Sequence, residues 1–270
     1  MSADAAHASR GLALITNDDG IDSAGLAVLA RAAIAVGLEV VVAAPESNSS
    51  GASAALSAMQ ADGRLLTREV SLDGLAGVRA LAVEASPALI AFVGSRGAFG
   101  PTPDVVLSGV NHGSNTGHAT IHSGTVGAAI TAASHGRRAL AVSVASMAPE
   151  HWSTVSRVCE TAVAWTMDHD VVGTVISVNV PDIALTDLRG LRSARLAPFG
   201  AVQAIVNEAG EGYVSMTFSD VDQPAEPDTD TALLGLGWAT ATALCAPCES
   251  PQINLSTIGS RMEEGVSHAR

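Results

Sequence analysis

This 270-residue chain contains no lysine, because all 14 of its basic residues are arginines. It therefore has no Walker-type phosphate lysine and no amine for a Schiff base with a carbonyl substrate or pyridoxal phosphate. Aromatic residues make up 3% of the chain, and cysteine occurs only at positions 159, 245 and 248. Three cysteines so late in the chain do not form a disulfide framework. These absences exclude several enzyme classes and predict a protein of the reducing cytoplasm.

Positive charge is scarce as well, since the formal net charge is −13 and the isoelectric point is near 4.8. Nucleic-acid affinity depends largely on cationic contacts to phosphates, so we expect no binding of duplexes. No uncharged apolar run approaches the roughly 18 residues that span a bilayer. The first residues also lack the basic start and apolar middle of a signal peptide. We therefore expect no membrane partner, and a small anionic substrate stays compatible with the charge.

Hydrophobic residues, in contrast, make up 47% of the chain and form short runs that alternate with helical patterns. This alternation is typical of βαβ units and predicts an α/β fold with a mostly parallel sheet. Strands are expected at 11–16, 38–44, 78–84, 104–108, 139–144 and 174–180, with a less regular one near 65–70. A helix that ends at Gly37 is expected between the first two strands, with Leu26, Leu29, Ala30, Ala33 and Ile34 on its buried face.

The composition changes after Pro181 to polar segments interrupted by glycine and proline. Within them, residues 213–218 alternate in polarity as a hairpin strand does, and the acidic stretch 219–230 resembles an exposed loop. The predicted division of the chain is an N-terminal tail over 1–10, a catalytic core over 11–185, a C-terminal arm and hairpin over 186–250, and a tail over 251–270.

Four polar segments lie where strands end or a helix begins, the places at which open α/β sheets bind ligands. Asp18 and Asp19 follow the first strand, the hydroxyl-rich loop around Ser50 follows the second, and Asn111 follows the strand at 104–108. Adjacent carboxylates repel each other unless a cation compensates, and Mg²⁺ prefers oxygen ligands. The helix that follows Ser123 offers free N–H groups to an anion. Together these segments predict a metal-assisted phosphatase.

The same segments resemble the SurE family of survival proteins in order and spacing. The resemblance is carried by Thr-Asn-Asp-Asp-Gly at 16–20, Ser-Gly-Ala-Ser at 50–53, Pro-Asp-Val-Val-Leu-Ser-Gly-Val-Asn at 103–111 and His-Ser-Gly-Thr-Val at 122–126. It extends over roughly residues 11–247 and is densest to about residue 145. It implies a Rossmann-like sheet with helices on both faces and a C-terminal arm exchanged between subunits. The implied activity is divalent-metal-dependent hydrolysis of phosphomonoesters, commonly of nucleoside monophosphates.

The resemblance also implies roles for individual residues. The expected ligands of one divalent cation per subunit, Mg²⁺ or Mn²⁺, are Asp18, Asp19, Ser50 and Asn111. The expected phosphate or substrate contacts are Asn17, Asn111, Asn115, Ser123, Gly124 and Thr125. Asp18 or Asp19 is expected to orient or deprotonate the attacking water, while His122 and His112 are both candidates for the general acid. The C-terminal arm is expected to hold together a homodimer or homotetramer.

Two departures from the family pattern leave the substrate open. The segment 46–49 has none of the basic residues that family members usually carry there, and segment 85–90 has Leu89 at a position that is acidic in the family. A phosphatase for another small phosphorylated metabolite is therefore an alternative. A further alternative is a non-catalytic nucleotide- or phosphate-binding protein of the same fold.

Overall fold

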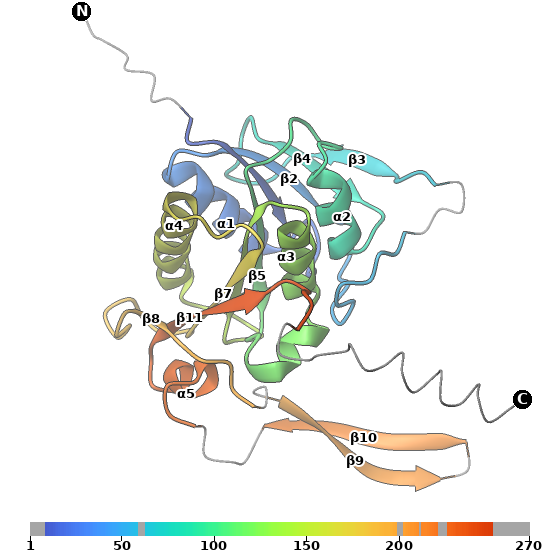
Figure 1. Cartoon of the computed structure of the whole chain (residues 1–270), viewed down its shortest axis with the longest axis vertical. Coiled ribbons are helices and arrows are strands. Elements are labelled where there is room, and N and C mark those ends of the chain that lie inside the picture. Colours follow the sequence, from blue (N-terminus) through green and yellow to red (C-terminus); the bar gives the residue numbers. More distant parts are fainter. Residues whose placement is uncertain (1–8, 59–62, 199–201, 211, 221–225, 251–270) are drawn as a thin grey trace, which may run out of the picture.

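The computed structural model describes residues 9–58, 63–198, 202–210, 212–220 and 226–250 (Figure 1). Nine strands form one sheet in the order β3-β4-β2-β1-β5-β6-β7-β11-β8. Their bounds are β1 Leu12–Thr16, β2 Glu39–Pro45, β3 Thr67–Val70, β4 Arg79–Val83, β5 Val105–His112, β6 Arg138–Val144, β7 Thr174–Val180, β8 Leu191–Ser193 and β11 Ala239–Cys245. The strands from β4 to β7 in this order are mutually parallel, whereas β3 and β11 pair antiparallel with their neighbours β4 and β7. The predicted mostly parallel α/β sheet is confirmed.

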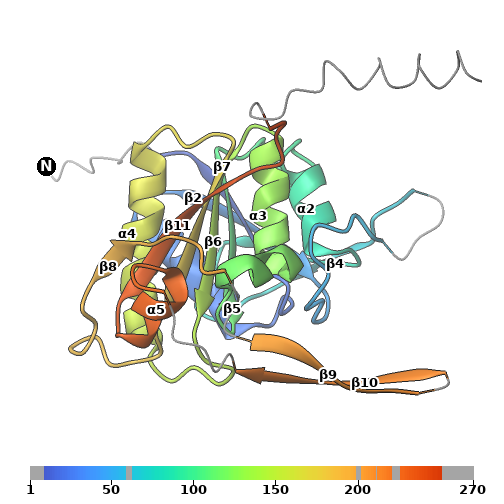
Figure 2. The same cartoon turned by 60° about the horizontal axis from the view of Figure 1, so that its bottom comes forward.

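Helices cover both faces of this sheet, as Figures 1 and 2 show. The helices α1 (Ala24–Ala35) and α4 (Trp152–Asp168) pack on one face, and α2 (Pro87–Gly94) and α3 (Gly124–Ser134) pack on the other. Parallel strands between two helical layers are buried on both faces, which explains why they form nearly continuous apolar runs in the sequence. The predicted strands are confirmed within a few residues, and β5 extends beyond its predicted end through Asn111.

Helix α1 confirms the helical pattern predicted after the first strand. Its residues Leu26, Leu29 and Ala33 are fully buried. The prediction for Ile34 is wrong, since this residue is 43% exposed; it lies at the edge of the apolar stripe, close to the helix end. Gly37 follows with φ of +89° and donates its N–H to the Ile34 carbonyl at 2.9 Å, so the helix ends as predicted.

The segment 186–250 contributes to two different structures. The strands β9 (Val202–Gly210) and β10 (Tyr213–Asp220) form the predicted hairpin, which projects away from the main sheet (Figure 2). Two further strands of the segment, β8 and β11, join the main sheet and were not predicted.

None of the described helices is long and apolar enough to cross a membrane.

The acidic stretch 219–230 was predicted to be an exposed loop, and this prediction is wrong for its last two residues. Thr229 is fully buried and caps the short helix α5 (Asp230–Gly235), and Asp230 is 1% exposed. Backbone N–H groups surround this carboxylate, which makes its burial tolerable. Residues 221–225, residues 1–8 of the predicted tail over 1–10, and the predicted tail over 251–270 lie outside the described residues.

Candidate active site

The turn after β1 begins the site and is shaped by Asn17. This side chain is fully buried; its Nδ2 donates to the Gly20 carbonyl at 2.9 Å, and its Oδ1 accepts from the Gly20 N–H at 3.2 Å. Such a side-chain-to-backbone pair closes a tight turn. Both polar atoms of the Asn17 amide therefore bond within the turn that carries Asp18 and Asp19. The contact of Asn17 with substrate stays a prediction.

Asp18 is buried, with 3% of the residue exposed, and Thr125 of α3 holds it. The Thr125 hydroxyl donates to Asp18 Oδ1. Burial raises the pKa of Asp18; the Thr125 hydroxyl lowers it, the charge of Asp19 raises it further, and the backbone N–H groups of Asp18 and Thr125 lower it. The structure therefore places both hydrogen-bond donors and a second negative charge near this carboxylate. An added cation would favour its charged form.

Gly124 lets α3 approach Asp18 closely. A Cβ atom at this position would lie 2.7 Å from Asp18 Oδ2 and 2.8 Å from Asp18 Cβ, closer than real Cβ contacts. The side chain of Asp18 therefore occupies the space that any other residue at position 124 would fill. This contact joins the predicted metal-binding turn to the predicted phosphate-binding helix end.

Asp19 contacts the end of β5, the strand that carries Asn111. The N–H of His112 donates to Asp19 Oδ2 at 3.1 Å. The amide nitrogen of Asn111 donates to the Gly113 carbonyl at 2.7 Å and to the His112 carbonyl at 3.2 Å. Because this nitrogen is engaged, Oδ1 is the atom of the Asn111 side chain that would serve as a ligand.

The hydroxyl-rich loop after β2 lies directly against Asp18. The N–H of Ser49 donates to the Asp18 carbonyl at 2.7 Å, and the N–H of Ser50 donates to Asn48 Oδ1 at 2.8 Å. Further along the loop, the Ser53 hydroxyl donates to the Ile121 carbonyl at 2.6 Å. The loop is thus fixed at Ser49 and at Ser53, and Ser50 lies exposed between these two anchors.

The helix end and Asn115 complete the predicted phosphate site. Ser123 caps α3 by accepting the Val126 N–H at 3.1 Å. Because the N–H of Thr125 is directed to Asp18, the N–H of Gly124 is the helix-end donor left for an anion. Asn115 donates from Nδ2 to the Ser143 hydroxyl at 2.8 Å, and an amide nitrogen carries a second N–H, so the predicted contact of Asn115 with substrate stays a prediction.

The two candidate acids differ in their surroundings. The ring of His112 packs against Trp152 with centroids 5.7 Å apart, and its Nε2 is buried with no hydrogen-bond partner in the part of the chain that the structure describes. His122 is exposed and immediately precedes Ser123. This geometry favours His122 over His112 as a group that exchanges protons with a substrate or with solvent.

The donor set fits a hard divalent cation. Two carboxylates, an amide oxygen and a hydroxyl are oxygen ligands of the kind that Mg²⁺ and Mn²⁺ accept. Within the described residues, no group of three or more His, Cys, Asp or Glu side chains comes together, so a nitrogen- or sulfur-rich metal centre is not found there. The burial of Asp18 next to Asp19 is the observation that a bound cation would explain best.

Some contacts of this site have no signal in the sequence. Ser143, Asn179 and Asp230 bind the loop that carries Asn115 through side-chain hydrogen bonds. Asn179 lies 64 positions from Asn115 along the chain, and Asp230 lies 113 positions from Gly117. No local pattern indicates contacts between such distant residues, although Asn179 and Asp230 both lie within residues 11–247, over which the sequence resembles the family.

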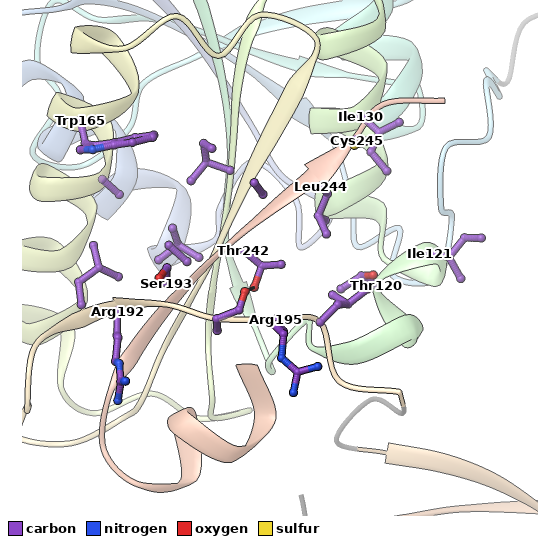
Figure 3. Close-up of a pocket in the computed structure, with 18 residues that line it drawn as sticks. Thr120, Ile121, Ile130, Trp165, Arg192, Ser193, Arg195, Thr242, Leu244 and Cys245 are labelled. Atoms are coloured by element: carbon purple, nitrogen blue, oxygen red, sulfur yellow. Dashed lines mark hydrogen bonds between the residues drawn. The ribbon is translucent and has the colours of Figure 1, made fainter. Parts of the chain in front are cut away.

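A larger groove, with a volume of about 940 Å³, lies elsewhere and contains none of the predicted site residues (Figure 3). Its apolar lining includes Ile130 of α3, Trp165 of α4 and Leu244 of β11. The two arginines at the groove are paired, Arg192 with Asp228 at 3.6 Å and Arg195 with Glu226 at 3.7 Å. The size of this groove therefore does not make it the catalytic site.

Comparisons with known proteins identify relatives that cover most of the chain. The family model for survival protein SurE matches residues 13–231. The chain is 35% identical over 239 residues to a 5'-nucleotidase SurE of Stutzerimonas stutzeri, covering 86% of this chain and 90% of the relative. It is 31% identical over 252 residues to a 5'/3'-nucleotidase SurE of Edwardsiella ictaluri, covering 92% of both chains.

A solved structure resembles the fold as well. The SurE protein from Aquifex aeolicus superposes with a TM-score of 0.73 at 24% sequence identity, covering 94% of this chain and 99% of that one. The α/β architecture is thus shared, while the sequence relatives carry the argument for common descent. On the family match and on these relatives, the chain belongs to the SurE family of survival proteins.

Proposed function

We propose that this protein is a divalent-metal-dependent phosphomonoesterase that hydrolyses nucleoside monophosphates. Its family makes it a phosphoric monoester hydrolase, and its relatives bear the names 5'-nucleotidase and 5'/3'-nucleotidase. The observation that carries the proposal is the contact of buried Asp18 with the N-terminal turn of α3, next to Asp19. A cation site and an anion site would then be neighbours, as metal-assisted hydrolysis of a phosphate ester requires.

The residues that would hold the cation are Asp18, Asp19, Ser50 and Asn111. When bound, the cation would polarise a phosphoryl oxygen and lower the pKa of a bound water. Thr125 fixes the orientation of Asp18 by its hydroxyl and its N–H, and His112 fixes that of Asp19 by its N–H. Both carboxylates are therefore preorganised.

Side chains and backbone groups of the protein would carry out the remaining steps, which are activation of water, stabilisation of charge and protonation of the leaving group. Asp18 or Asp19 orients the attacking water and accepts its proton. The N–H of Gly124 and the amide of Asn115 donate to phosphoryl oxygens and stabilise the charge that develops on them. His122, exposed beside Ser123, donates a proton to the oxygen of the departing alcohol.

The alcohol part of the substrate would occupy a cleft beside Ser50. This cleft has a volume of about 600 Å³, and its lining includes five serines together with Glu46 and Glu84. Hydroxyls and carboxylates of this kind accept hydrogen bonds from the hydroxyls of a ribose or another sugar. Glu46 also pairs with Arg68 at 2.7 Å, and no arginine is among the described residues that line the cleft.

The same cleft supports a second candidate substrate class. Ser86, in the segment that departs from the family pattern, accepts the Leu89 N–H at 3.4 Å and caps α2. This segment lines the cleft through Ala85 and Ser86, so a changed sequence there would change the alcohol that fits. A phosphorylated metabolite other than a nucleotide is the alternative substrate on this ground.

We also propose a homodimer or homotetramer held by the C-terminal arm, in the cytoplasm. A hairpin of two strands is marginal on its own, and contact of β9 and β10 with a second copy would stabilise it. The free thiols of the three cysteines fit a reducing compartment. Light scattering tests the assembly. If the proposal is right, a variant without residues 202–220 should form particles with fewer subunits than the unaltered protein. An unchanged number of subunits contradicts it.

The experiment that tests the activity measures phosphate release from nucleoside 5'- and 3'-monophosphates and from sugar phosphates. Each substrate is measured with Mg²⁺, with Mn²⁺ and with a chelator. The proposal expects metal-dependent release that is fastest with nucleotides. Faster release from a sugar phosphate favours the alternative substrate, and tight nucleotide binding without release from any ester favours a non-catalytic protein.

A further inference from the structure

Two buried side chains hold the loop between β5 and α3 from outside the predicted site. Asn179, at the end of β7, accepts the N–H of Asn115 at 2.8 Å and donates to its carbonyl at 2.9 Å. Asp230, in the first turn of α5, accepts the N–H of Gly117 at 2.8 Å through Oδ2. Each of the two residues is 1% exposed. The loop is thus fixed at two points only two residues apart.

Asp230 connects this loop to the C-terminal part of the chain. Its Oδ1 accepts the N–H of Ala197 at 3.0 Å and that of Thr231 at 2.8 Å. A carboxylate can accept from several donors at once, and three backbone N–H groups offset the cost of its burial. The helix-capping role is already filled by Thr229, whose hydroxyl accepts the Ala232 N–H at 3.4 Å. The contact with Thr231 also serves the start of α5, but neither cap explains the bonds of the Asp230 carboxylate to Ala197 and Gly117.

The contact between Asp230 and Gly117 affects the predicted phosphate site because Gly117 lies between Asn115 and the start of α3. Gly117 begins the short 3-10 helix η1 (Gly117–His122), which leads directly to Ser123, and it lies two residues after Asn115. Displacing the N–H of Gly117 would move the groups on both sides of it, the Asn115 amide and the start of α3. Losses of about 100-fold in rate follow from errors of about 1 Å in such groups.

We propose that Asp230 is a positioning residue of the active site, which holds Asn115 and the Ser123 turn in register with Asp18 by anchoring Gly117. The inference rests on the proposed function, because it assigns Asn115 and the helix end to the phosphate. It gives the first residue of α5 a role in the site, although α5 belongs to the segment that follows the predicted core.

The test compares Asp230→Asn with the unaltered protein. An asparagine has one acceptor oxygen, and its NH₂ group would face a backbone N–H where Asp230 presents its second oxygen. If the remaining oxygen keeps Ala197 and Thr231, the contact with Gly117 is lost. We expect kcat to fall about 10- to 100-fold at a temperature at which the variant is fully folded. We also expect weaker binding of inorganic phosphate, measured by titration calorimetry.

Asp228→Asn is the matched control. It makes the same chemical change two residues away, at an exposed side chain that pairs with Arg192 at 3.6 Å. The control should keep the kcat, KM and phosphate affinity of the unaltered protein. A purely structural role of Asp230 would lower the unfolding temperature and leave these three constants unchanged, which would overturn the proposal.

Two further results separate the possible failures. If the unaltered protein releases no phosphate from any ester, the proposed function fails, and the difference in phosphate affinity still tests the role of Asp230. If Asp230→Asn does not fold, amide hydrogen exchange of Gly117 in the unaltered protein decides. Strong protection of this amide that weakens in a folded Asp230→Glu variant, together with a lower kcat, supports the proposal. Exchange as fast as in an exposed loop contradicts it.

Discussion

Replacing Gly124 by alanine tests the close contact on which the site is built. The new Cβ would lie 2.7 Å from Asp18 Oδ2, whereas ordinary contacts begin at 3.4 Å, so the carboxylate has to move by about 0.7 Å. Overpacking of this kind typically costs about 1–3 kcal/mol, and it outweighs the gain of at most about 1 kcal/mol from alanine in a helix. We expect the free energy of unfolding to fall by about 1–2 kcal/mol.

The same displacement should reduce catalysis more than stability. A carboxylate misplaced by nearly 1 Å lowers the rate by about 100-fold, so kcat should fall by one to two orders of magnitude in assays of phosphate release. Gly235→Ala is the matched control, because a Cβ added at this helical glycine of α5 would meet no described atom within 4 Å. Its activity should be unchanged. A Gly124→Ala protein with full kcat and unaltered stability would refute the contact between α3 and Asp18.

Three further predictions concern single groups. Thr125→Val removes the hydroxyl that donates to Asp18 while keeping the shape of the side chain; kcat should fall about tenfold, and an unchanged kcat would contradict the role of this hydroxyl. Burial raises the pKa of Asp182, but the N–H groups of His151 and Glu150 lower it more, so its folded pKa lies below its unfolded value. The stability it contributes is therefore present above the unfolded pKa and lost as pH falls through the folded pKa. Asp182→Asn should lose about 1–2 kcal/mol at pH 7 and less at pH 3 in denaturant titrations. Burial raises the pKa of Cys159 to about 12, so thiol reagents at pH 8 should modify it only after unfolding, and rapid modification in the native state would contradict its burial.

The central strands could be predicted because their burial on both faces leaves a local signal. Strands such as β1 and β6 appear as short apolar runs between turn residues, and α1 shows its helical spacing directly. The strand β11 has no comparable signal, since Ala239–Cys245 alternates alanine with threonine and has little contrast in polarity. Its place in the sheet depends on antiparallel pairing with β7, which only the folded chain provides.

The candidate site shows the same division. The residue types of Asp18, Asp19 and Asn111, and their places after predicted strands, can be read directly from the sequence. They indicate oxygen ligands from the sequence alone. The partners that orient them are distant: the hydroxyl on Asp18 comes from Thr125, 107 positions along the chain. The sequence therefore indicates the candidate groups of the site, whereas the restraints on their geometry depend on tertiary contacts.

Phosphate release from a nucleoside monophosphate by the unaltered protein and by Asp19→Asn, with Mn²⁺ and with a chelator, tests the central claim most directly. The variant keeps the size of the side chain and removes one of the two charges that would hold the cation. The account predicts release that requires the metal and falls at least about 100-fold in the variant, with the fold retained. Equal release with chelator, or full activity of Asp19→Asn, would contradict a metal-dependent phosphatase centred on the Asp18 and Asp19 pair.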